Sequence, residues 1–174
     1  MSVYVIEGCT CAGKSTLMRF MCEQDGTLQP APEHTPPRVI EGEDMLSRQQ
    51  RIFTDFMQSY CALDRSPVSY VTDYSPVGCA AFSLALYYYT GDERYKQQSD
   101  SFIRTCCDLG VHVDHYIEQP AKLICARLRS RGRDTDDVWS EQFIECLVAA
   151  YHEIFSGKSL NLPTNNNKEE TETC

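Results

Sequence analysis

Near its N-terminus the chain reads Gly8-Cys9-Thr10-Cys11-Ala12-Gly13-Lys14-Ser15. Two glycines bound this stretch, and a lysine and a hydroxyl residue follow the second glycine directly. The run from Val3 to Ile6 before it is β-branched and aromatic, as in a buried parallel strand. The run from Thr16 to Met21 after it has the apolar spacing of a helix. Such an arrangement directs backbone N–H groups and the positive end of a helix dipole toward one point.

Each residue type in this loop suits contact with phosphate. Gly8 and Gly13 permit backbone conformations that a side chain would obstruct. Lys14 can reach the β- and γ-phosphates of a nucleotide, and the hydroxyl of Ser15 can ligate Mg²⁺. The pattern therefore predicts a binding site for a nucleoside triphosphate, with Thr16 as its last member.

Length and composition indicate one ordinary globular domain. The chain has 174 residues, of which 42% are hydrophobic and 24% are charged. We expect a single domain over residues 1–157 and a polar, flexible tail over residues 158–174. A formal net charge of −9 argues against a nucleic-acid partner, which would need a basic face.

No targeting or membrane signal is visible. The chain lacks a run of about 18 apolar residues, so no membrane span is expected. The predicted strand at Val3 leaves no room for a signal peptide. We therefore expect a cytoplasmic or nucleocytoplasmic protein whose partners are small-molecule nucleosides or nucleotides.

The ten cysteines do not form a metal-binding pattern, because no pair of C-x₂-C clusters is present. We expect free thiols that act as small hydrophobic residues in a reducing compartment. Cys9 and Cys11 lie near a predicted helix N-terminus, where the pKa of a thiol falls. Our hypothesis is that their oxidation or alkylation blocks the nucleotide site.

Strands and helices alternate along the rest of the chain. After Val3–Ile6 the predicted strands are 38–40, 68–72 and 111–117, whereas four prolines between Gly26 and Pro37 predict no regular structure. The helices predicted after the first one are 45–64, 76–89, 95–109, 120–128 and 139–155. This order predicts a three-layer α/β/α fold with a parallel sheet of four or five strands.

Ligands of such sheets gather where the strands end. Asp73 follows the predicted strand 68–72, so we expect it to hold Mg²⁺ together with Ser15. The alternative is that Asp73 caps the helix that begins near Ser75 and Pro76.

A second acidic site follows the predicted strand 38–40. Glu41 comes directly after this strand, so we expect it to act as the general base for an acceptor hydroxyl. The alternative is a solvated acidic helix start, shared with Glu43 and Asp44.

A cluster of arginines follows the predicted helix 120–128. Arg127 and Arg131 are four residues apart and share one helix face. Together with Arg133 they predict an Arg-rich lid, over about residues 127–138, that closes on the transferring phosphate. The alternative is a basic helix end that interacts with the helix dipole.

These motifs resemble the deoxynucleoside kinases, which share their fold with the thymidylate kinases. Ile6 to Leu17 is similar to the family opening I-E-G-x-x-x-A-G-K-S-T-L. The helix from Phe53 to Tyr60, followed by Arg65, is similar to the family's base-reading helix. Arg127-x-x-x-Arg131-Gly-Arg133, followed by Asp136, resembles the lid. The similarity spans about residues 3–155.

The resemblance implies transfer of phosphate from ATP, with Mg²⁺, to the 5′-hydroxyl of a thymidine-like deoxynucleoside. Lys14 and the loop amides would hold the donor, and Glu41 would accept the proton. Negative charge on the phosphoryl group during its transfer would be stabilised by Arg127, Arg131 and Arg133. On the acceptor, Gln58 and Arg65 would read the base and Asp136 would hold the 3′-hydroxyl.

Two departures from the family keep other functions open. Tyr74 stands where the family has an arginine, and Gly42 stands where it has a proline. A thymidylate kinase is the alternative enzyme, and its acceptor phosphate would need a contact from Arg38, Arg48 or Arg51. A non-catalytic nucleotide-binding regulator is the alternative of another class. The apolar run from Ala80 to Tyr89 also suits a homodimer interface.

Overall fold

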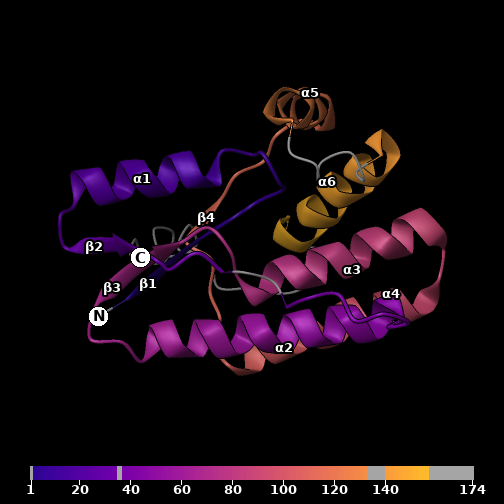
Figure 1. Ribbon diagram of the computed structural model, residues 1–174, viewed down its shortest axis with the longest axis horizontal. Helices are drawn as coiled ribbons and strands as arrows, with labels where there is room; N and C mark the ends of the chain where they lie inside the picture. The colour runs from indigo at the N-terminus through magenta and orange to yellow at the C-terminus, as the bar shows by residue number, and fades with distance from the viewer. Residues whose placement is uncertain (1, 35–36, 133–139, 157–174) are drawn as a thin grey trace, which may run out of the picture.

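The computed structural model describes residues 2–34, 37–132 and 140–156 (Figure 1). Part of the predicted lid, with Arg133 and Asp136, and the predicted tail lie outside these residues. The elements in chain order are β1 (Val3–Glu7), α1 (Lys14–Gln24), β2 (Leu28–Pro30), α2 (Met45–Asp64), β3 (Ser69–Thr72), α3 (Pro76–Thr90), α4 (Glu93–Asp108), β4 (His115–Tyr116), α5 (Ala121–Arg131) and α6 (Glu141–Phe155).

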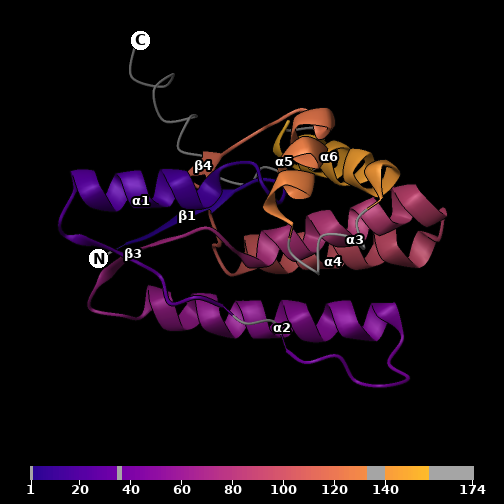
Figure 2. The same ribbon diagram turned by 45° about the horizontal axis from the view of Figure 1, so that its top comes forward.

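The four strands form an all-parallel sheet in the order β2-β3-β1-β4. β1 is a central strand, and Val5 and Ile6 are fully buried there. Figures 1 and 2 show α1 on one face of the sheet and α2 on the other. The predicted α/β class and parallel sheet are therefore confirmed. Because all strands run the same way, their carboxyl ends meet at one edge, where β1 leads into the glycine loop.

The strand predicted at 38–40 is wrong. Val39 and Ile40 are 66% and 54% exposed and belong to no strand, although both have high β-propensity. The second strand is β2, inside the proline-rich segment. Its residue Leu28 pairs with Ser69 of β3. Because β2 is an edge strand, Pro30 can end it without removing a bond from a central ladder.

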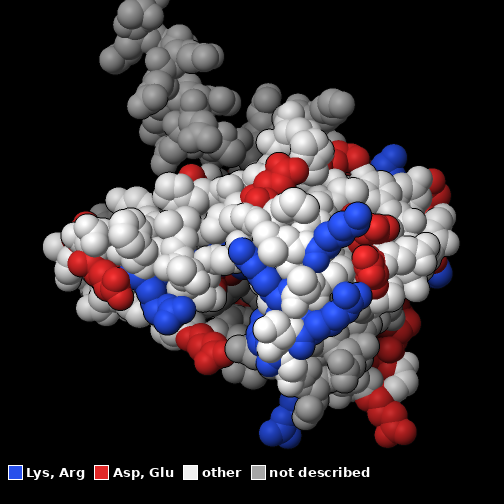
Figure 3. All heavy atoms as spheres, turned by 90° about the horizontal axis from the view of Figure 1, so that it is seen from above, with Lys and Arg blue, Asp and Glu red and all other residues white. Residues whose placement is uncertain are grey.

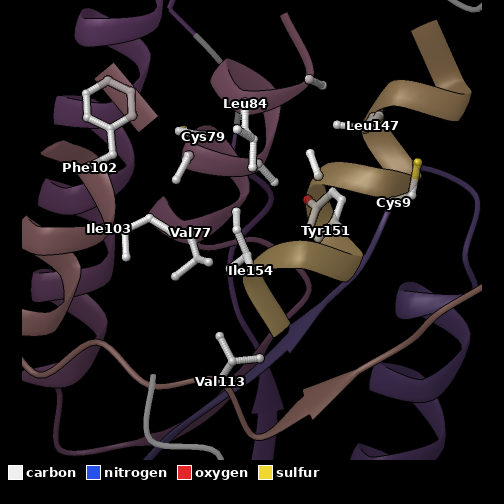
Figure 4. Packing of buried hydrophobic residues seen from close by; sticks show 14 of the residues in the cluster. Cys9, Val77, Cys79, Leu84, Phe102, Ile103, Val113, Leu147, Tyr151 and Ile154 are labelled. Carbon is white, nitrogen blue, oxygen red and sulfur yellow. The ribbon is translucent and has the colours of Figure 1, made fainter. Parts of the chain in front are cut away.

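The core lies where α3 packs between α4 and α6, and Figure 4 shows side chains of these helices turned toward one another. Its buried side chains include Val77, Leu84, Phe102, Ile103, Leu147 and Ile154. α3 is apolar around most of its circumference because it is buried on several sides. This burial accounts for most of the apolar run 80–89, in which Tyr88 and Tyr89 remain exposed; the homodimer stays a prediction.

No helix in the described ranges combines the length and the apolar character needed to cross a bilayer. The described cysteines are free thiols, as expected.

Candidate active site

The loop between β1 and α1 has a backbone that depends on its glycines. Gly8 has φ +145° and Gly13 has φ +112°, values that side chains rarely tolerate. A Cβ on Gly8 would lie 2.5 Å from the carbonyl oxygen of Ile117, whose N–H donates to the carbonyl of Glu7 at 2.9 Å. A Cβ on Gly13 would meet open space. The loop is thus held against β4 on one side and open on the other.

Lys14 places its charge over this loop. Its Nζ donates hydrogen bonds to the carbonyl oxygens of Gly8 at 2.7 Å and Cys9 at 3.0 Å. Lys14 is also the first residue of α1, so its ammonium group and the positive helix end act on the same place. The combination suits a polyphosphate group, which a helix N-terminus binds through backbone N–H groups.

Asp73 lies at the predicted place, directly after β3. The hydroxyl of Ser15 donates a hydrogen bond to the Asp73 carboxylate. The alternative role of Asp73 as a helix cap is not observed, because the side chain of Ser75 caps α3 by accepting from Val77 N–H. A hydroxyl and a carboxylate are both ligands that Mg²⁺ accepts, and they fit a site completed by nucleotide phosphates and water.

Arg127 reaches the loop from α5. Its Nη1 donates hydrogen bonds to the carbonyl oxygens of Cys11 at 3.0 Å and Ala12 at 3.3 Å. Figure 3 shows basic side chains gathered on the face that carries α5, although the chain as a whole is acidic. Arg129 instead pairs with Glu141 of α6 at 3.1 Å. The first arginine of the predicted lid therefore contacts the glycine loop.

Sequence reasoning missed the role of Glu7, which is buried immediately before the loop. Its carboxyl group accepts from the Ser75 hydroxyl at 2.5 Å, the Tyr151 hydroxyl at 3.2 Å and Gly8 N–H at 3.3 Å. Burial raises the pKa of this carboxyl, although the nearby charge of Lys14 acts in the opposite direction. Glu7 thus joins the loop to the start of α3 and to α6.

Glu7 should make stability depend on pH. Because folding raises its pKa, the folded protein favours the protonated form of Glu7. The stability that this protonated group contributes is fully present below the unfolded pKa of 4.5 and is lost as the pH rises through the folded pKa. Glu7→Gln cannot ionise, so its Tm should fall less than that of the wild type as the pH rises above the unfolded pKa. Glu153→Gln changes an exposed carboxyl that accepts from Tyr88, and should keep the wild-type pH dependence. Equal pH slopes for Glu7→Gln and the wild type would contradict the assignment.

The hypothesis of a reactive Cys9 is contradicted. Burial raises the pKa of its thiol to about 12 and outweighs the charge of Lys14. Because thiolates are the reactive form, Cys9 should stay unmodified by iodoacetamide at neutral pH while the protein is folded. Peptide mass spectrometry should detect its full modification in urea. Equally fast modification in the native protein would show that the side chain is more accessible than the structure indicates.

Glu41 is not at a strand end. It lies in an exposed turn, and the reason for expecting it beside the loop is lost with the strand 38–40. The residues that follow β2 are Ala31 and Pro32, and the first carboxylate beyond them is the exposed Glu33.

The two residues expected to read the base are not brought to this edge. Gln58 is exposed on α2, and Arg65 caps the C-terminus of α2, just before β3 begins. Arg65 therefore lies toward the amino end of β3, opposite the glycine loop. The buried amide of this helix is Gln49, which is 4% exposed and has a weak contact at 3.7 Å with the sulfur of Met45. Sequence periodicity offers one signal, since Gln49 shares a helix face with Phe53.

Tyr74 joins the ends of two strands. Its hydroxyl donates to the carbonyl oxygen of Pro32 at 3.0 Å, so the residues after β3 are tied to those after β2. Its ring packs against His34 and Phe56. An arginine at this position would add a charge, whereas Tyr74 makes this side of the site aromatic.

Comparisons with known proteins agree with this architecture at the level of the fold. No family model matches the chain, and no curated protein matches its sequence. A deoxyadenosine kinase from M. mycoides with bound dATP matches with a TM-score of 0.65 and 15% identity, over 94% of this chain and 89% of that chain. The same enzyme with the product dCMP matches with a TM-score of 0.66 and 16% identity, over 94% of this chain and 88% of that chain. The chain therefore has the P-loop kinase fold of the deoxynucleoside kinases.

Proposed function

We propose that this chain is an ATP-dependent kinase for the 5′-hydroxyl of a deoxynucleoside, thymidine-like by preference. One observation carries the proposal: Lys14, the Ser15–Asp73 pair and Arg127 all contact a single glycine loop. In phosphoryl transfer a lysine holds the donor phosphates, oxygen ligands hold the metal ion, and an arginine neutralises charge on the transferring group. The fold of a known deoxyadenosine kinase supports the nucleoside as acceptor.

Each group has a distinct part in the proposed reaction. Lys14 gives up its hydrogen bonds to the loop carbonyls and binds the donor phosphates instead. Ser15 and Asp73 would hold Mg²⁺, which neutralises charge on the phosphate oxygens when it is bound. Arg127 stabilises the charge that develops on the γ-phosphoryl group. Arg131 and Arg133 continue this lid in the proposal and help to exclude water, which would otherwise hydrolyse the donor.

Specific observations bear on two alternatives. A thymidylate kinase would need a cationic contact from the Arg38, Arg48 or Arg51 region. Arg51 is already held by both oxygens of Glu43, at 2.6 and 2.9 Å, which argues against its use for a substrate phosphate. A non-catalytic nucleotide-binding regulator is favoured by Tyr74, which stands where the family has an arginine, and by the exposed turn in which Glu41 lies.

The test is a screen of acceptors. Purified protein with Mg²⁺ and γ-labelled ATP is incubated with each of the four deoxynucleosides and each monophosphate, and labelled products are separated by thin-layer chromatography. Labelled deoxynucleoside monophosphates support the proposal, and labelled diphosphates favour the thymidylate kinase. Nucleotide binding with no labelled product favours the regulator and contradicts the proposal.

A further inference from the structure

A histidine–aspartate pair lies between the segment after β2 and helix α2. Nε2 of His34 is 2.6 Å from Oδ2 of Asp55, and the histidine side chain is 7% exposed. The imidazole packs on the Phe56 ring with centroids 4.0 Å apart, and its centroid is 5.1 Å from that of Tyr74. Its other nitrogen, Nδ1, is buried and has no hydrogen-bond partner among the residues that the structure describes.

The contact with Asp55 assigns the tautomer of this histidine. An ionised carboxylate only accepts, so Nε2 carries a proton, and in the neutral imidazole Nδ1 then presents a lone pair. A buried acceptor without a partner lowers stability, and a native structure that keeps one calls for an explanation. An oriented imidazole with a free lone pair is the arrangement that general bases use.

The pair lies at the edge of the sheet where the glycine loop begins. Tyr74, which packs on His34, directly follows Asp73, and Asp73 contacts Ser15 of the loop. The bond from Tyr74 to Pro32 holds the segment that carries His34 against the end of β3. Among the described residues after β2 the first carboxylate is the exposed Glu33, and Glu41 lies in an exposed turn.

We propose that His34, oriented by Asp55, is the general base for the acceptor hydroxyl. The inference rests on the proposed kinase function. The hydroxyl proton moves to Nδ1 while the hydroxyl oxygen bonds to the γ-phosphorus. The bond from that phosphorus to the bridging oxygen breaks, and ADP leaves with the bonding electrons. Asp55 pairs with the resulting imidazolium, which then releases its proton to water.

Two features of the surroundings bear on this role. Nδ1 is buried in a ring that packs on Phe56 and Tyr74, so a neighbouring side chain must move before an acceptor can reach it. Among the described residues, the charged and titratable groups near the pair include Arg51 on α2, Tyr74 after β3 and the neighbouring Glu33. Glu43 and, to a smaller extent, Asp55 raise the pKa of Arg51, and burial raises that of Tyr74. The competing base is Glu33, the exposed carboxylate next to His34.

The test compares kcat and KM of His34→Gln, Asp55→Asn and Glu33→Gln with the wild type. His34→Gln should lose roughly 10²- to 10⁴-fold in kcat, with KM for the acceptor changed by less than about threefold. Asp55→Asn should lose about tenfold or more, because the imidazole is no longer held in the required tautomer. The matched control is His152→Gln, which alters an exposed histidine 3.0 Å from Glu118 and should leave kcat unchanged.

The pH dependence separates a base from a structural residue. Wild-type kcat should fall at low pH, since a protonated imidazole cannot accept a proton, and this fall should be absent in His34→Gln. Near wild-type kcat in His34→Gln, or a large loss confined to Glu33→Gln, overturns the inference while the kinase proposal stands. A wild-type protein that phosphorylates no acceptor overturns both.

A second measurement covers the case in which His34→Gln does not fold. The imidazole ¹⁵N resonances of the wild-type protein are followed while deoxynucleoside is added. The Nδ1 resonance of His34 should shift, whereas those of His152 should not. An unchanged His34 resonance at saturating acceptor overturns the inference.

Discussion

Replacement of Lys14 by alanine should lower kcat/KM for ATP by roughly 10²- to 10³-fold. The reason is that its Nζ, which lies over the carbonyls of Gly8 and Cys9, supplies a positive charge at the loop where the phosphates are proposed to bind. The half-buried side chain adds little to the core, so the free energy of unfolding should change by about 1 kcal/mol or less. Steady-state kinetics and thermal unfolding followed by circular dichroism measure the two effects.

Lys96→Ala is the matched control for this variant. Lys96 is exposed on α4 and lies 5.8 Å from the centre of the Tyr87 ring, away from the loop. Its removal deletes the same charge and should leave kcat/KM unchanged. Wild-type turnover by Lys14→Ala would remove the assignment of the loop as the donor site.

Gly8→Ala should abolish nucleotide binding and lower stability by about 3 kcal/mol. The new methyl group would lie 2.5 Å from the carbonyl oxygen of Ile117, and the φ of +145° is unfavourable for alanine. The hydrogen bond from Ile117 N–H to the Glu7 carbonyl prevents a simple retreat of this residue, so the loop itself must move. Urea unfolding and titration with a fluorescent ATP analogue measure the two losses.

The control for this variant is Gly26→Ala. The φ of Gly26 lies outside the left-handed region, and a Cβ there would meet no atom within 4 Å. This change should leave both stability and nucleotide binding close to wild type. If Gly8→Ala bound the analogue as tightly as Gly26→Ala does, the close contact with Ile117 would not restrict the loop.

Local patterns allowed much of the fold to be predicted. The helix 45–64 has the predicted bounds, because no glycine or proline interrupts it and Asp44 caps it by accepting from two backbone N–H groups. β2 was not predictable in this way. Three residues of mixed polarity become a strand because β3 lies beside them, whereas exposed Val39 and Ile40 have no such partner.

The candidate site likewise contains residues whose place follows from local sequence signals and residues whose place depends on tertiary structure. The loop residues and Asp73 follow from strand, turn and helix signals within a few positions of each other. Glu41 depended on a predicted strand and lost its place with it. The contact of Glu7 with Tyr151 joins residues 144 positions apart, and the pairing of His34 with Asp55 depends on how the segment after β2 crosses α2. Such pairs need tertiary structure, because no local periodicity marks them.

The most direct test of the central claim is ³¹P NMR of the wild-type protein mixed with ATP, Mg²⁺ and an excess of thymidine or another deoxynucleoside. If the loop, Asp73 and Arg127 form a phosphoryl-transfer site, the γ-phosphate signal of ATP should be replaced by a phosphomonoester signal, in step with the appearance of ADP. Signals that stay unchanged with every deoxynucleoside, or that yield inorganic phosphate alone, would contradict the account.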